Sequence, residues 1–158
     1  MPNSIGLYIH IPFCVQKCHY CDFYCLPPEE NTLEAYAHAL LQAAESYRGI
    51  AVDTVYFGGG TPTLAGASWL GRTLSELSRI FSIQPNSEII LEANPETVDS
   101  VMLEALRKDG FNRISFGLQT TEDHTLALLG RQHTAERGKQ AVLWAKEAGF
   151  DNISADIM

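Results

Sequence analysis

The sequence predicts an α/β protein in which parallel strands alternate with helices, arranged as part of a (β/α) barrel. Short apolar runs alternate with segments whose apolar residues recur at helical spacing. Capping residues and glycines separate the two kinds of segment. About four and a half βα units fit into the 158 residues. Because a complete eight-unit barrel takes about 250 residues, we expect an incomplete barrel.

The first half of the chain contains two predicted strands and two predicted helices. The apolar run 5–11 predicts the first strand and the run 52–57 the second. Apolar residues at helical spacing over 31–47 predict a helix that packs against the core, is capped at its first or second residue, and is ended by Gly49. The same spacing over 69–81 predicts the second helix.

The second half continues the alternation. Asp99 is the expected cap of one helix and Gly110 its end. A short extra helix is expected before the last long one. The predicted strands are 87–91, 112–118 and 152–158, and the predicted helices are 99–109, 122–129 and 134–148.

The composition of the chain disfavours several classes of function. Apolar residues make up 46% of the chain, as in globular proteins. The net charge of -8, from 11 basic and 19 acidic residues, disfavours nucleic-acid binding, which needs clustered cations. No run approaches the roughly 20 apolar residues of a transmembrane segment, and the N-terminus shows no secretory signal. We therefore expect a cytoplasmic protein, in which cysteines more often bind metal than form disulfides.

Three cysteines stand close together after the first predicted strand, in the pattern Cys14-x₃-Cys18-x₂-Cys21. Three thiolates on one short loop can hold three irons of a [4Fe–4S] cluster, which normally takes four cysteines. Such a loop would leave one iron open for a ligand, as catalytic zinc sites keep one position open. Zinc with His19 as a fourth ligand is the main alternative, and a disulfide is another. Cys25 is interpreted as an ordinary buried thiol.

Polar residues and glycines follow the later predicted strands. Gly58-Gly-Gly60 and Thr61 follow the second strand, Glu92 and Asn94 the third, and Gln119 the fourth. Because the carboxyl ends of parallel strands meet at one edge of a sheet, we expect a ligand site there. The glycines fit neither the dinucleotide nor the P-loop spacing. They allow close backbone approach, and we expect their free N–H and C=O groups to bond a zwitterion such as an amino acid.

Each of these residues also has a plainer interpretation. The glycines can form an ordinary turn between a strand and a helix. Glu92 can cap a helix or form an ion pair, and Arg131 can be an exposed surface residue. His10, between two isoleucines, is interpreted as a packed strand histidine.

The cysteine spacing, with an aromatic residue at Tyr20, resembles the signature of the radical S-adenosylmethionine (SAM) superfamily. Further segments resemble the oxygen-independent coproporphyrinogen III oxidase family, and the resemblance extends over essentially the whole chain. These segments are Leu7-Tyr-Ile-His-Ile-Pro-Phe-Cys14, Tyr56-Phe-Gly-Gly-Gly-Thr-Pro62, Glu92-Ala-Asn-Pro95, Arg113-Ile-Ser-Phe-Gly-Leu-Gln119 and Leu129-Gly-Arg131.

The resemblance implies a [4Fe–4S] cluster on Cys14, Cys18 and Cys21, with SAM chelating the open iron. It implies that Glu92 and the glycine backbone bind the SAM ammonium and that Arg131 binds a carboxylate. In an active member the reduced cluster cleaves SAM to methionine and a deoxyadenosyl radical, while the protein orients the reactants and excludes water. The residues implied for the SAM pocket are Tyr8, Tyr20, Gly59, Gly60, Thr61, Glu92, Gln119, Arg131 and Asp156.

Phe23 distinguishes two branches of this family. The oxidase carries a further cysteine two residues after the third one, where this chain has Phe23, and Cys25 stands at a different offset. Phe23 resembles the haem chaperone branch instead. The resemblance therefore implies a haem chaperone-like protein of haem and porphyrin metabolism. A coproporphyrinogen III oxidase and an inactive truncated fragment are the alternatives.

The resemblance also implies a domain organisation and a set of partners. Residues 1–158 match the N-terminal portion of a radical SAM core domain, without the rest of the barrel or the C-terminal domain. In the chaperone branch, haem contacts are expected in that C-terminal domain. The expected partners are SAM, haem or a porphyrinogen, and a reductant.

Overall fold

The computed structural model describes residues 4–158, which contain a sheet of five parallel strands. The strands lie side by side in chain order, as the predicted βα units require. Residues 1–3, part of the segment in which no secretory signal was expected, lie outside the described range. The strands are β1 (Ile5–Ile11), β2 (Ala51–Gly59), β3 (Ser82–Ala93), β4 (Arg113–Gln119) and β5 (Asn152–Ile157).

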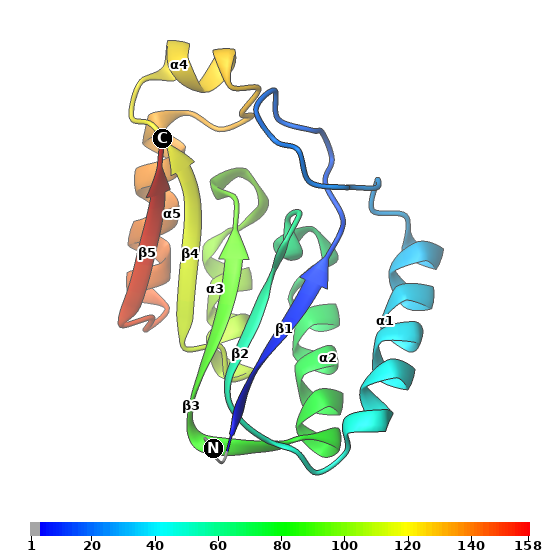
Figure 1. Ribbon diagram of the computed structural model, residues 1–158. Helices are drawn as coiled ribbons and strands as arrows, with labels where there is room; N and C mark the ends of the chain where they lie inside the picture. Colours follow the sequence, from blue (N-terminus) through cyan, green and yellow to red (C-terminus); the bar gives the residue numbers. More distant parts are fainter. Residues whose placement is uncertain (1–3) are drawn as a thin grey trace.

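The long helices all cover one face of this sheet, and the other face is open (Figure 1). The sheet is not closed, so the prediction of an α/β fold with a partial barrel is confirmed. Within residues 4–158, no helix combines the length and the hydrophobicity that crossing a membrane would take. The helices are α1 (Glu30–Ala44), α2 (Ala67–Ile80), α3 (Ser100–Lys108), α4 (Asp123–Leu128) and α5 (Ala135–Glu147), with short 3₁₀ turns η1 (Glu45–Tyr47), η2 (Pro62–Ala65) and η3 (Pro95–Thr97).

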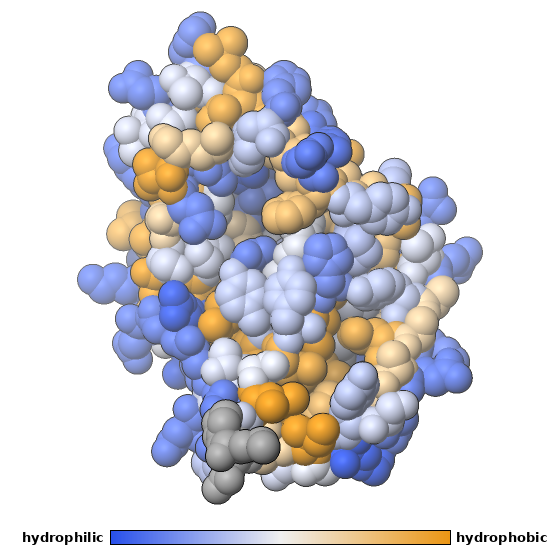
Figure 2. Space-filling view, in the orientation of Figure 1, coloured by the Kyte–Doolittle hydropathy of each residue, from blue (hydrophilic) through white to orange (hydrophobic). Residues whose placement is uncertain are grey.

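The two faces of the sheet differ because successive side chains of a strand point to opposite sides. The side chains on the helix-covered face form the apolar core. On the open face, hydrophilic and near-neutral residues lie across the middle of the molecule (Figure 2). The buried core side chains of the strands include Ile9, Ile11, Val55, Phe57, Leu91, Ile114 and Phe116.

The helix ends follow the predictions in part. Asp99 caps α3, because its side chain accepts a hydrogen bond from the Met102 amide at 2.8 Å. The prediction that α1 is capped at its first or second residue is wrong: α1 begins at Glu30, and the preceding Glu29 makes no capping hydrogen bond through its side chain. Tyr47, expected in the core, is 57% exposed because the chain leaves the α-helical path after Ala44.

Strand β3 begins at Ser82, earlier than predicted, and this additional first part contains Pro85. The register with β2 shifts between Val52 and Thr54, so β3 bulges between its two paired parts. Proline cannot donate a ladder hydrogen bond and is tolerated at such a bulge. At the end of the bulge, the Ser87 hydroxyl donates a hydrogen bond to the Val52 carbonyl of β2 at 3.0 Å.

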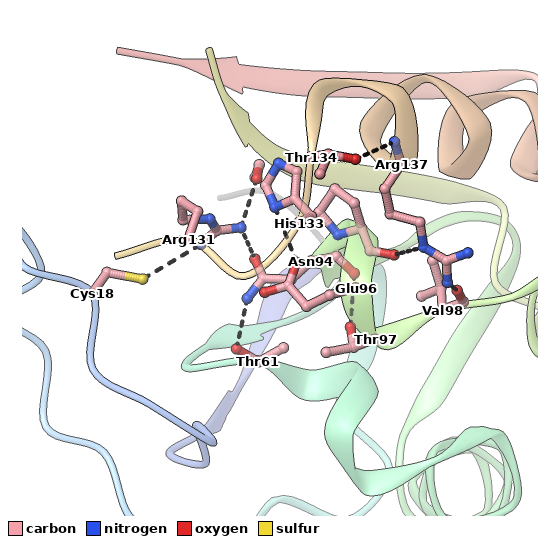
Figure 3. A network of polar contacts seen from close by, with 12 residues as sticks. Cys18, Thr61, Asn94, Glu96, Thr97, Val98, Arg131, His133, Thr134 and Arg137 are labelled. Atoms are coloured by element: carbon pink, nitrogen blue, oxygen red, sulfur yellow. Dashed lines mark hydrogen bonds and ion pairs between the residues drawn. The ribbon is translucent and has the colours of Figure 1, made fainter. Parts of the chain in front are cut away.

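A polar network joins the start of α5 to the turn that follows β3 (Figure 3). His133 is buried, and its Nδ1 lies 3.1 Å from a Glu96 carboxylate oxygen. Arg137 donates to the carbonyls of Pro95 and Val98 at 3.1 Å and 2.5 Å. These contacts fix the segment between α4 and α5 against the carboxyl end of β3.

Glu96 makes stability depend on pH. Burial alone would raise its pKa, but the hydrogen bond with His133, its own backbone N–H and the charge of Arg131 hold the pKa below the ordinary value of 4.5. The unfolded state therefore takes up the proton first as the pH falls. The stabilisation is present above about pH 4.5 and is lost as the pH falls through the lowered pKa.

We expect the free energy of unfolding of the wild type to fall more steeply below about pH 5 than that of Glu96→Gln. Urea unfolding at a series of pH values measures both slopes. Glu104→Gln, which changes an exposed carboxylate on α3, is the matched control and should keep the wild-type slope. Equal slopes for the wild type and Glu96→Gln would contradict the role assigned to Glu96.

Candidate functional site

A cavity of about 210 Å³ opens at the carboxyl ends of the five strands. The topology explains it, because a parallel sheet brings every strand end to the same edge. Eleven of the twelve residues implied by the family resemblance line this cavity. They are Cys14, Cys18, Tyr20, Cys21, Gly59, Gly60, Thr61, Glu92, Gln119, Arg131 and Asp156.

Tyr8 is the residue of that set that the structure places outside the cavity lining. It lies on the open face of β1, below the strand end, and is 55% exposed. Its hydroxyl is 3.0 Å from Nδ1 of His10, and its ring lies against the Tyr56 ring at 5.7 Å between centroids. Burial, and then the charge of Glu92, raise the pKa of Tyr8. His10 packs within the strand, as interpreted from the sequence.

Backbone hydrogen bonds join the two ends of the cysteine loop. The Cys14 amide donates to the Leu26 carbonyl at 3.0 Å, and the Leu26 amide donates to the Pro12 carbonyl at 2.8 Å. The four cysteines are free, partly buried thiols. Burial, and then the neighbouring Cys25 thiol, raise the pKa of Cys14 to about 11. Without a metal, Cys14 therefore stays protonated at neutral pH.

A single zinc ion is the alternative to a cluster on this loop. Among residues 4–158, no three His, Cys, Asp or Glu side chains converge on a point where one metal ion could bind. A tetrahedral zinc site needs that convergence, whereas the thiolates of a cubane cluster bind separate irons. His19, the alternative zinc ligand, lies against the end of α4, with Nδ1 2.9 Å from the Leu128 carbonyl. Cys25, interpreted as a buried thiol, instead lines the cavity.

The end of β2 requires glycine because several segments meet there. A Cβ on Gly58 would come within 2.6 Å of the Tyr56 ring, and one on Gly60 within 2.6 Å of the Phe13 carbonyl. Gly59 has a φ of +114°, a conformation that favours glycine. Because Gly58 and Gly60 have no side chain, the end of β2 approaches the cysteine loop closely. A larger side chain at either position would fit only if the neighbouring atoms moved.

The N–H groups of Gly59 and Gly60 are paired within the protein, so they are not the free donors expected from the sequence. The Gly60 amide donates to the Ile11 carbonyl at 2.8 Å, and the Gly59 amide donates to Oε2 of Glu92 at 3.0 Å. Sequence reasoning could not foresee these partners, since they come from β1 and β3. Backbone hydrogen-bonding groups in such a packed region are normally paired.

Glu92 is the acidic group of the cavity, and it is firmly oriented. Oε1 accepts a hydrogen bond from the Tyr56 hydroxyl at 2.5 Å, in addition to the bond from Gly59 on Oε2. Burial and this contact with Glu92 raise the pKa of Tyr56, so Tyr56 remains a donor at neutral pH. A carboxylate held in this way presents negative charge at one place and can receive a cationic group.

Asn94 connects the segments on the other side of the cavity (Figure 3). Its Nδ2 donates to the Thr61 hydroxyl at 3.0 Å, and its Oδ1 accepts from Nη2 of Arg131 at 2.6 Å. Nη2 also donates to the Gly117 carbonyl at 2.6 Å, and Nη1 lies 3.6 Å from Sγ of Cys18. Arg131 is therefore part of the cavity wall and not a free surface residue.

Several lining residues were not assigned from the sequence. Asn94 was placed at a strand end without a role, and its position two residues after Glu92 was the available signal. For Gln119, which the resemblance did imply, the structure adds a backbone signal. It is the one non-glycine residue with positive φ, +64°, in the described part of the chain, a conformation often found at functional sites. The unassigned lining residues are Gln16, Lys17, Phe23, Cys25, Ala93, Asn94, Ser115 and Gly117.

Comparisons with known proteins agree with this architecture. A family model of the radical SAM superfamily matches residues 8–158. The chain is 35% identical over 157 residues to the heme chaperone HemW of Lactococcus lactis and 38% identical over 158 residues to that of Bacillus subtilis. The alignments cover 99% and 96% of this chain but 41% of each relative. The chain thus spans about two fifths of the length of these relatives.

Solved structures show the same fold. Coproporphyrinogen III oxidase from Escherichia coli, a radical SAM enzyme, matches with a TM-score of 0.89 at 29% identity, over 98% of this chain and 37% of that chain. Methylornithine synthase matches with a TM-score of 0.65 at 14% identity, over 98% of this chain and 44% of that chain, and shows the fold alone. On its strand order, its motifs and the match over nearly its whole length, the chain belongs to the radical SAM superfamily.

Proposed function

We propose that this chain holds a [4Fe–4S] cluster and SAM as part of a haem chaperone-like protein. The supporting observation is that three cysteine thiols, Glu92 and the segment 59–61 line one cavity at the carboxyl ends of the strands. The radical SAM superfamily uses this cluster and SAM. The haem part of the proposal depends on relatives named as haem chaperones.

The thiols suit a cluster better than a single ion. Cys14, Cys18 and Cys21 are free, share the cavity and do not converge on one point. Thiolate is the ligand that holds iron–sulfur clusters. Because the pKa of Cys14 is raised to about 11, binding of iron would have to displace its proton, and loading would release protons.

The opposite wall of the cavity suits SAM. Glu92, oriented by Tyr56 and Gly59, faces the cavity and would accept hydrogen bonds from the SAM ammonium. Tyr20 would form a stacking wall, and Asp156 would accept from ribose hydroxyls or an amine. When bound, the cluster and SAM supply the one-electron chemistry, and these side chains orient them and exclude water.

Phe23 favours the chaperone over the oxidase. It lines the cavity and is 63% exposed at the position where the oxidase would carry a further cysteine. The second candidate function, an oxygen-independent coproporphyrinogen III oxidase, is supported by the structural match to that enzyme at a TM-score of 0.89.

Haem titration tests the chaperone assignment. We expect a form extended to the full length of the relatives to bind haem, and absence of binding by that form would reject the assignment. A parallel anaerobic assay with dithionite, SAM and coproporphyrinogen tests the oxidase. Formation of protoporphyrinogen and deoxyadenosine would support the oxidase instead.

Substitution of single cysteines tests the cluster. Cys18→Ala should abolish cluster loading, because each of the three loop thiolates is needed for one iron. Cys25→Ala is the matched control and should load normally, since it removes a thiol of the same cavity that is not a proposed ligand. Iron and sulfide counts after anaerobic reconstitution measure both. Loss of the cluster in Cys25→Ala would contradict the three-ligand site.

Two glutamates of β3 test the SAM site. Glu92→Gln should weaken SAM binding by roughly tenfold or more, because a hydrogen bond to a charged group contributes about 1.5–3 kcal/mol. Glu88→Gln is the control, since Glu88 lies on the same strand and the same face but pairs with Arg113 outside the cavity. Equilibrium binding of SAM to the reconstituted protein gives both affinities. Equal losses would indicate a general effect of β3 and contradict the assignment.

A further inference from the structure

We propose that Arg131 sets the reduction potential of the cluster by holding its positive charge against the sulfur of Cys18. This inference rests on the proposed function, namely that Cys18 is a cluster ligand. It adds a role for Arg131 that does not involve contact with SAM. The contact in question joins Nη1 of Arg131 to Sγ of Cys18 at 3.6 Å (Figure 3).

The guanidinium is held in one position. Both hydrogens of Nη2 are used, one on Oδ1 of Asn94 and one on the Gly117 carbonyl, each at 2.6 Å. Asn94 is held in turn by the Thr61 hydroxyl at 3.0 Å. Arginine suits this arrangement because its planar fork of donors fixes several acceptors at once. Nη1 is thereby directed at the cysteine loop.

No carboxylate among residues 4–158 forms a hydrogen bond or ion pair with Arg131, although the charge of Arg131 lowers the pKa of Glu96 from a greater distance. The hydrogen-bond acceptors of Arg131 are an amide, a carbonyl and a thiol, and none of the ion pairs found within residues 4–158 includes it. Its Nε is buried without a hydrogen-bond partner. A half-buried cation in such surroundings is costly unless negative charge lies nearby. Cluster-bound thiolates would bring negative charge to this wall of the cavity.

The consequence for the cluster follows from electrostatics. Reduction by one electron adds negative charge, and a fixed cation beside a ligating sulfur stabilises the reduced form more than the oxidised form. Net charge and hydrogen bonds to the sulfurs are among the factors that set iron–sulfur potentials. Arg131 should therefore make the cluster easier to reduce, and Asn94 should act as the residue that positions it.

Redox titration of the reconstituted chain, without SAM, tests this inference, because a lost contact between Arg131 and SAM then cannot contribute. Arg131→Gln should load the same iron and sulfide as the wild type. Its equilibrium constant for reduction should fall by about tenfold, which is a shift of about 59 mV to more negative potential for a one-electron couple. Arg137→Gln is the matched control, since Arg137 belongs to the same network but bonds only the carbonyls of Pro95 and Val98. It should leave the potential close to that of the wild type.

The possible results distinguish a failure of the proposed function from a failure of the inference about Arg131. A wild-type chain that loads no iron or sulfide overturns the proposed function and this inference together. Normal loading of Arg131→Gln with the wild-type potential, or an equal shift in Arg137→Gln, overturns the inference alone. If Arg131→Gln does not load a cluster, the Asn94→Ala variant tests the inference instead. This variant keeps the positive charge of Arg131 but removes the side chain that holds Arg131 in position. A shift to more negative potential in Asn94→Ala supports the inference, and an unchanged potential overturns it.

Discussion

The side-chain amide of Asn94 is the contact on which the candidate site depends most. It binds Thr61 at the end of the β2 loop and Arg131 in the segment between α4 and α5, and Arg131 reaches the Cys18 sulfur. A parallel sheet brings its strand ends to one edge but leaves the loops beyond them unconnected. Asn94, which follows β3 near the middle of the sheet, joins these loops because one amide offers both a donor and an acceptor.

The separation of the two sheet faces makes this site possible. The long helices cover one face and bury its apolar side chains in the core. The open face carries polar residues such as Glu88, Arg113 and Glu92, which bond one another or their neighbours. Polar groups on a half-open face keep access to water and avoid the cost of full burial. The cavity at the edge of this face thus combines buried anchors with access from outside.

The cysteine loop contrasts with the sheet beside it. Between β1 and α1 the described chain forms no helix or strand. The hydrogen bonds around Leu26 hold its beginning, and the contacts of His19 with the end of α4 hold its middle. If the loop holds the proposed cluster, the cluster would supply part of its order. The rest of the site is formed by residues already oriented by protein contacts.

The order and type of the elements could be predicted from the sequence, because hydrophobic periodicity and capping residues such as Asp99 are local signals. Of the twelve site residues that the sequence motifs indicated, eleven line the cavity, since parallel strands bring their ends together. The position of Tyr8 below the cavity, the hydrogen bond from the Gly59 amide to Glu92 and the pairing of His133 with Glu96 became known from the folded structure. Local patterns record which residues are buried, whereas the partner of a polar group depends on strand register and on how far each loop reaches.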